Sequence, residues 1–120
     1  MSKAVDREDR EWRFYIDDMI VFAEKVVAYT NGLDQPAFVA SGLVYDATLR
    51  NLELIGEAAT HVPDDVCAAH PQVPWRLVVA TRNRLIHGYL GIDHDTLWSI
   101  VVSDVPALLP MLRTVRDAAA

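Results

Sequence analysis

The chain has 120 residues, 52% of them hydrophobic, which suits a single globular domain over residues 1–120 with an apolar core. The formal net charge of −6 excludes proteins that coat nucleic acid indiscriminately, so any contact with RNA must be local. The single cysteine, Cys67, cannot form an internal disulfide, which favours a reducing compartment. Residues 1–10 lack the apolar stretch of a signal peptide, and no apolar run approaches the roughly 18 residues of a membrane span. We therefore expect a cytoplasmic protein without a membrane segment.

The first half of the chain predicts two long helices and one short one. Apolar positions recur at helical spacing over residues 6–30, and Asn31-Gly32 is a natural stop. The predicted core face of this helix comprises Trp12, Ile16, Met19, Ile20, Ala23, Val26 and Val27. Asp34-Gln35-Pro36 predicts the start of a short helix, and a second long helix follows over residues 42–61. Gly56 costs this helix about 1 kcal/mol relative to alanine, which favours a close approach of another helix there.

The second half predicts two further long helices after a connector. Residues 62–74 hold three prolines and at most one helical turn, at residues 64–69. A third long helix opens at Pro74-Trp75, and Gly88 and Gly91 flank its end. Asp93 can cap a last helix that runs to about residue 116, although Pro106 and Pro110 predict kinks or an early break in it. Its apolar ladder comprises Leu97, Val101, Val105, Leu108, Leu112 and Val115.

Strands, glycine-rich phosphate loops and Cys-x-x-Cys pairs are not predicted anywhere. The expected fold is all-α, an antiparallel bundle of four long helices plus one or two short helical turns. Such a bundle does not define an activity, so function must be argued from particular residues.

The stretch R-N-R-L-I-H-G-Y, residues 82–89, lies in the third long helix. A seam at heptad spacing runs through it, formed by Trp75, Val78, Arg82, Leu85 and Tyr89. An arginine on an otherwise apolar seam needs a partner or a cleft that receives it. Asn83 and His87 share a face, whereas Arg82 and His87 are about 140° apart around an ideal helix. One straight helix can therefore direct both at one spot only through the long reach of arginine, or with a second copy of the helix opposite.

Charge singles out the same region. Residues 66–92 contain no Asp or Glu but include Arg76, Arg82 and Arg84, so this window carries +3. The remaining 8 basic and 17 acidic residues give −9 elsewhere. A basic island in an acidic protein indicates a site for an anion.

Charged residues crowd the second long helix and leave two interpretations open. The residues are Asp46, Arg50, Glu53 and Glu57. They can form surface pairs three or four positions apart, such as Arg50 with Glu53. Alternatively, one carboxylate orients Arg82 or Arg84, because a partly buried arginine requires a partner.

We expect neither a metal nor a cofactor. His87 and His94 would need two further ligands, and no helix carries a second histidine at matching spacing. Cys67 fits a small buried apolar residue better than a nucleophile.

Four sequence blocks in series carry a resemblance to a known family: N-L-E-L-I-G-E-A-A at residues 51–59, V-P-W-R at 73–76, R-N-R-L-I-H-G-Y-L-G-I-D at 82–93 and L-L-P-M-L at 108–112. They resemble, in order, the blocks of HEPN-domain ribonucleases, whose signature is R-x-x-x-x-H, and especially the HepT-like toxins with R-x-x-x-x-H-x-Y. The resemblance covers roughly residues 10–115 and implies a HEPN-like helical fold. Gly88 stands where the family often has a larger polar residue, which leaves the signature intact.

The resemblance implies a toxin ribonuclease of a type VII-like toxin–antitoxin pair, with Arg82 and His87 catalytic at a composite site across a homodimer. It also implies that an MntA-type minimal nucleotidyltransferase antitoxin silences the toxin by transferring AMP to Tyr89. The residues themselves suit metal-independent RNA cleavage, since an imidazole such as that of His87 can accept or donate a proton and Arg82 offers a fork of donors to phosphate. Asn83, Arg84 and Arg76 are expected to support RNA binding.

A second function fits the same residues. The protein can instead be a non-catalytic helical binding module that docks a nucleotidyltransferase and a nucleotide, with Arg82 and His87 contacting only a nucleotide phosphate. Both functions require a basic pocket, so the sequence does not separate them. A plain dimerisation module leaves the acid-free basic window unexplained.

Overall fold

The computed structural model describes residues 2–87 and 92–118, with side chains over 11–87 and 92–118. Every regular element within these ranges is helical, which confirms the predicted all-α class. The elements are α1 (Ser2–Thr30), α2 (Gln35–Ala40), α3 (Gly42–Ala59), α4 (Asp64–Ala69), α5 (Trp75–His87), α6 (His94–Ser99), the π-helical turn η1 (Ile100–Asp104) and α7 (Val105–Ala118). The predicted break at Gly88 and Gly91, and the site predicted at Tyr89, lie outside the described residues.

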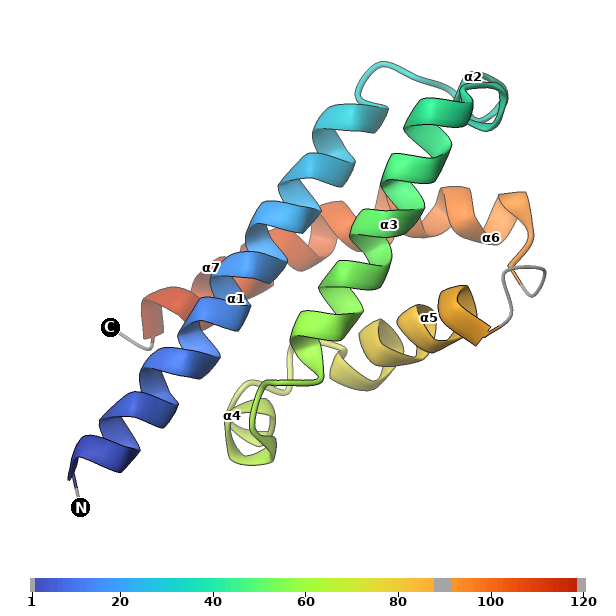
Figure 1. Cartoon of the computed structure of the whole chain (residues 1–120). Coiled ribbons are helices and arrows are strands. Elements are labelled where there is room, and N and C mark those ends of the chain that lie inside the picture. Colours follow the sequence, from blue (N-terminus) through green and yellow to red (C-terminus); the bar gives the residue numbers. More distant parts are fainter. Residues whose placement is uncertain (1, 88–91, 119–120) are drawn as a thin grey trace.

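The core forms where α1 packs against both α3 and α7. Figure 1 shows α1 and α3 running antiparallel, with α7 crossing behind α1. Six of the seven positions predicted on the core face of α1 are buried, and Val27 is half-buried. All six positions of the ladder predicted for the last helix are buried as well. Helical periodicity in the sequence therefore identified both faces that meet in the core.

Short polar residues set several helix boundaries. α1 stops before Gly32, whose φ of 79° lies in the left-handed region that favours glycine. The Asp34 side chain then starts α2 by accepting a hydrogen bond from the Ala37 N–H at 3.0 Å. The Asp93 carboxylate accepts from the Thr96 N–H at 2.7 Å, which confirms the cap predicted for the last helix. These caps fix where each helix begins and hence how its apolar face is turned.

Helix α5 packs on α3, on the side of α3 away from α1 (Figure 1). The two helices approach most closely at Gly56. A Cβ atom there would overlap the Arg82 Cβ and would lie 3.1 Å from the Val78 carbonyl oxygen. The close approach predicted at Gly56 is therefore confirmed, and the approaching helix is the one that carries the 82–89 stretch.

The last helical stretch continues through both of its prolines. It is helical from His94 to Ala118, so of the kinks or early break predicted at Pro106 and Pro110, the break is absent. Instead, the chain widens into η1 just before Pro106, where the Val105 N–H bonds to the Ile100 carbonyl five residues back. Proline lacks an N–H, and its ring crowds the carbonyl four residues earlier. A π-helical turn provides the extra room without ending the helix.

The stretch His94–Ala118 is also, by length and composition, the one helix among the described residues that is apolar enough to cross a membrane. The sequence did not indicate this, because Asp95, Asp104 and Arg113 interrupt its apolar runs. In the structure its apolar ladder is buried in the core, with α7 packed against α1. Packing of this kind gives the stretch a structural role inside the domain, and core helices of globular proteins pass the same compositional test.

Candidate active site on helix α5

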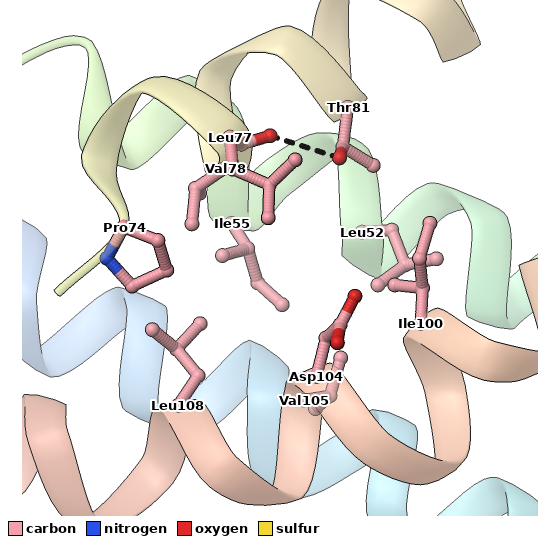
Figure 2. A pocket seen from close by; sticks show the side chains of 10 residues that line it. All are labelled: Leu52, Ile55, Pro74, Leu77, Val78, Thr81, Ile100, Asp104, Val105 and Leu108. Atoms are coloured by element: carbon pink, nitrogen blue, oxygen red, sulfur yellow. Dashed lines mark hydrogen bonds between the residues drawn. The ribbon is translucent and has the colours of Figure 1, made fainter.

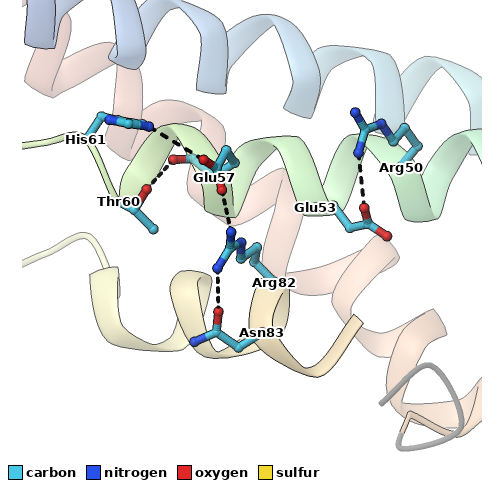
Figure 3. Close-up of polar contacts among 7 residues, drawn as sticks. All are labelled: Arg50, Glu53, Glu57, Thr60, His61, Arg82 and Asn83. Carbon is cyan, nitrogen blue, oxygen red and sulfur yellow. Dashed lines mark hydrogen bonds and ion pairs between the residues drawn. The ribbon is translucent and has the colours of Figure 1, made fainter. Parts of the chain in front are cut away.

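Arg82 lies at the interface of α5 with α3, with 25% of its side chain exposed. Its aliphatic stem passes over Gly56, and its guanidinium lies between two oxygen acceptors (Figure 3). Nη2 donates to Glu57 Oε2 at 2.6 Å, and Nη1 donates to Asn83 Oδ1 at 2.8 Å. Nε is buried without a hydrogen-bond partner among the described residues. The partner that an arginine on this seam requires is therefore Glu57.

Glu57 is also connected to α1, because His61 lies beside it and stacks on a residue of α1. Its Oε1 lies 3.5 Å from Nε2 of His61, and the His61 ring stacks on Tyr15 of α1 with centroids 4.6 Å apart. Figure 3 shows His61 and Arg82 approaching the Glu57 carboxylate from opposite sides. The carboxylate that holds Arg82 is thereby connected to both α1 and α5.

A neighbouring carboxylate of α3 behaves differently. Glu53 forms an ion pair with Arg50 at 3.2 Å, three positions away on the same helix. The two interpretations left open by the sequence are thus both realised, with Arg50 and Glu53 forming a surface pair and Glu57 reaching across to Arg82.

Arg76 and Asn83 share another face of α5. They are one heptad apart, and both line a wide groove between α4 and α5. The floor of this groove is mainly apolar and includes Val62, Val73 and Val79. Because Asn83 also accepts the Arg82 hydrogen bond, it connects the guanidinium with the open end of the groove.

His87 and Arg84 lie on the outer face of α5, and both are exposed. They are three residues apart and share that face, whereas Arg84 is about 200° around the helix from Arg82. The regular helix from Trp75 to His87 therefore keeps His87 and Arg82 about 140° apart, as predicted. The described hydrogen bonds of Arg82 are with Glu57 and Asn83.

In the folded chain, carboxylates from outside residues 66–92 lie close to the arginines of this basic window. Glu57 of α3 neutralises Arg82. The pKa of the exposed Asp93 carboxyl is lowered, chiefly by the hydrogen bond from the Thr96 N–H and to a smaller extent by the Arg84 charge. Glu57 is far from the window in sequence and Asp93 lies immediately after it, so the positive charge offered to an anion is smaller than the count of +3 indicated.

An apolar pocket lies on another side of α5, between α3, η1 and α7 (Figure 2). Its walls include Ile55, Val78 and Leu108, and Asp104 is the charged residue among those that line it. Leu77 borders this pocket and is 56% exposed. The pocket offers apolar surface but no set of polar groups suited to bond rearrangement.

Neither cysteine chemistry nor a metal cluster is apparent in the described part of the chain. Burial and the charges of Asp64 and Asp65 raise the pKa of the half-buried Cys67 thiol, which disfavours the nucleophilic thiolate. Residues 2–87 and 92–118 contain no group of three His, Cys, Asp or Glu side chains placed to bind a metal ion.

The family model described as "Ribonuclease HepT-like" matches residues 19–115, a stretch that contains all of α5. The chain belongs to the HepT-like ribonuclease family. A Methanocaldococcus jannaschii protein named as a "Putative RNase" is 37% identical over 99 residues, which cover 82% of this chain and 91% of that protein. A Thermococcus cleftensis protein named "Probable ribonuclease HepT" is 34% identical over 99 residues, covering 82% and 90%. No solved structure matches the chain significantly.

Membership of the HepT-like family places the candidate residues in context. The R-x-x-x-x-H stretch lies within the matched region, on α5, which packs against α3. Sequence reasoning found Arg82, Asn83, Arg84, His87 and Arg76. It did not single out His61, although its spacing of four residues from Glu57 was a local signal, or Tyr15, which packing of α1 brings onto the His61 ring.

Proposed function

We propose that this HepT-like protein is a toxin endoribonuclease that cleaves RNA without a metal ion at a composite site formed by two copies of the chain. The single observation that carries the proposal is the arrangement of α5. Arg82 is held at the α3 interface, His87 is exposed on the outer face, and the helix keeps them about 140° apart. A second copy of α5 would bring a second His87, so that one phosphate could meet both a base and an acid.

The proposed chemistry uses the RNA's own 2′-hydroxyl as the nucleophile. It attacks the adjacent phosphorus and expels the 5′-oxygen, which leaves a cyclic phosphate on one fragment. One His87 imidazole accepts the 2′-hydroxyl proton, and the imidazolium of the second copy's His87 protonates the leaving oxygen. The Arg82 guanidinium stabilises the charge that develops on the phosphorane oxygens. Arg76, Asn83 and Arg84 hold the neighbouring phosphates.

Exposed apolar surface on α5 supports a homodimer. Leu77 and Ile86 of α5 are 56% and 43% exposed, and Val102 of η1 is 47% exposed. Among the described residues of α5, only Leu85 is fully buried within one chain. Leu77 and Ile86 lie about 180° apart around α5, so association of two copies through the Leu77 face would cover Leu77 and bring the two motif helices together.

The proposal includes a protein partner that controls the activity. A minimal nucleotidyltransferase antitoxin transfers AMP to Tyr89, and the added phosphate occupies the position of the RNA phosphate. The position of Tyr89 in the sequence supports this, since it comes two residues after His87 and one heptad after Arg82. We place this toxin–antitoxin pair in the cytoplasm.

The alternative function is a non-catalytic module that docks a nucleotidyltransferase and a nucleotide. The exposed apolar side chains of α5 and the groove that holds Arg76 and Asn83 also suit it. Under this alternative Arg82 and His87 contact a nucleotide phosphate and break no bond.

Digestion of RNA by the purified protein in excess EDTA tests the proposal. We expect the wild-type protein to release fragments that end in a cyclic phosphate. Arg82→Ala and His87→Ala should each lower the rate at least 100-fold, as loss of a catalytic acid–base group typically does. Arg50→Ala removes an exposed arginine from a separate ion pair and serves as the matched control. Loss of cleavage in EDTA and its restoration by a divalent ion would refute the metal-independent mechanism, and absence of cleavage would favour the docking module.

A further inference from the structure

Arg82 can act on a phosphate only if its guanidinium is held in one place, and α5 alone does not hold it. An arginine side chain loses substantial rotamer entropy when it is fixed. In this structure the Cβ and Cγ of Arg82 lie over Gly56, where any larger residue would collide with them. Glu57, the next residue of α3, receives Nη2 at 2.6 Å. Adjacent residues of α3 thus contact both ends of the Arg82 side chain.

The hydrogen bonds leave part of the guanidinium available. One N–H of Nη2 goes to Glu57 and one N–H of Nη1 goes to Asn83. Each of these terminal nitrogens carries a second N–H. Together these two N–H groups form a pair of donors that a phosphate can accept. Glu57 therefore fixes the orientation of the fork without using all of its donors.

Glu57 is itself held from the opposite side. His61 Nε2 lies 3.5 Å from Oε1, and the His61 ring rests on Tyr15. Glu57 is 48% exposed, so this ion pair is screened by water and its strength alone is a weak argument. The case rests on geometry, because Arg82 of α5 and His61, which is itself stacked on Tyr15 of α1, flank one carboxylate of α3.

From this geometry we infer that Glu57 is a positioning residue for the proposed cleavage, acting through Arg82 and supported by His61. The inference rests on the proposed function as far as activity is concerned. The geometric part stands separately, because the orientation of Arg82 can be measured without any RNA.

Glu53 provides a matched control for Glu57. Both are glutamates of α3, one helical turn apart, and both pair with an arginine, but the partner of Glu53 is Arg50. We expect Glu57→Ala to lower kcat at least tenfold with KM changed less than threefold. Glu57→Gln keeps the shape and an acceptor oxygen and should recover part of kcat. Glu53→Ala should stay within twofold of the wild-type protein.

A double variant separates positioning from a general structural effect. If Glu57 acts through Arg82, then Glu57→Ala should cause no further loss in an Arg82→Ala background. An equal loss in both backgrounds would overturn the inference. A Glu57→Ala protein that cleaves faster than the wild-type protein would overturn it too, since Glu57 would then compete with RNA for Arg82.

Nuclear magnetic resonance gives the readout that does not need activity. The Nε–H signal of Arg82 is assigned by its absence in Arg82→Lys. We expect this signal to shift and to exchange faster with water in Glu57→Ala, and to stay unchanged in Glu53→Ala. An unchanged Arg82 signal in both Glu57→Ala and Glu57→Gln would refute the positioning role even if Glu57→Ala lost stability. If these signals respond as expected but the wild-type protein cleaves no RNA, the proposed function fails and the placement of Arg82 by Glu57 stands.

Discussion

Arg82 and His87 differ in how firmly the fold holds them. Arg82 contacts Gly56, Glu57 and Asn83, so its side chain is part of the contact between α3 and α5. His87 is exposed at the end of α5 and forms no hydrogen bond or ion pair with the described residues. A fixed cation and an accessible imidazole match the two roles proposed for them, since charge stabilisation gains from preorganisation and proton transfer needs access to the RNA.

Tyr89 is the proposed switch, and one substitution tests it. Tyr89→Phe keeps the aromatic ring and deletes the oxygen that accepts AMP. We expect the variant to cleave RNA within about twofold of the wild-type rate, since the substitution removes one hydroxyl oxygen and keeps the ring. It should gain no 329 Da adenylate increment, roughly the mass of one transferred AMP unit, when its nucleotidyltransferase and ATP are added.

Tyr45→Phe is the control for this substitution, because Tyr45 packs against Phe38 within the described part of the chain. The control should still be modified and silenced. If Tyr89→Phe is modified and silenced as well, the acceptor is another residue, and Tyr45, Tyr15 and Tyr29 become the candidates.

At the residue scale, the sequence predicted which side chains carry chemistry better than it predicted their partners. An arginine on an apolar seam indicates that a partner exists. From the sequence alone, however, Asp46, Glu53 and Glu57 were equally good candidates for that partner. Only the contact of α3 with α5 at Gly56 decides between them, because it places residue 57 opposite Arg82. A contact of this kind depends on packing between helices, which local patterns do not encode.

Gly56 matters at the scale of whole elements, because it sets the distance between α3 and α5. Alanine there would gain about 1 kcal/mol of helix propensity. Its Cβ would overlap the Arg82 Cβ, and overpacking of this kind costs about 1–3 kcal/mol. We therefore expect Gly56→Ala to lower the melting temperature and to reduce RNA cleavage by displacing Arg82, as measured by calorimetry and by the digestion assay.

Gly42→Ala is the matched control for Gly56→Ala. Gly42 begins the same helix, and a Cβ there would meet nothing within 4 Å. This control should be neutral or slightly stabilising, with full activity. A Gly56→Ala protein that melts higher than the wild-type protein would show that α3 and α5 are not held together as closely as described.

The helices were largely predictable because their apolar faces repeat at helical spacing and their starts carry capping residues. The short helix α4 agrees with the predicted residues 64–69, and α5 begins at the predicted Trp75. The π-helical turn before Pro106 was not predictable in the same way. A proline indicates that helical hydrogen bonds will be disrupted. Whether the helix ends there or forms a π-helical turn depends on how well its apolar residues pack before and after the proline.

For the whole molecule, the central expectation is a dimer formed through the exposed apolar side chains of α5. Light scattering at micromolar concentration should give twice the chain mass of 13.4 kDa. Leu77→Asp places a charge on this surface and should shift the protein to a monomer that has lost its ribonuclease activity.

Leu43→Asp is the control, since Leu43 is even more exposed, at 84%, and lies at the start of α3. It should leave the dimer intact. A wild-type protein that is monomeric and active, or a Leu77→Asp protein that remains a dimer, would place the proposed interface elsewhere or remove it.

The activity of a mixed dimer tests the composite site most directly. Wild-type and His87→Ala chains with two different tags are produced together, and dimers that carry one of each are isolated by two affinity steps. If one site uses the His87 of both copies, the mixed dimer lacks either the acid or the base, and its rate should fall below about a tenth of the wild-type rate. A mixed dimer that retains half of the wild-type rate would show that each chain carries a complete and independent site, which would contradict the account.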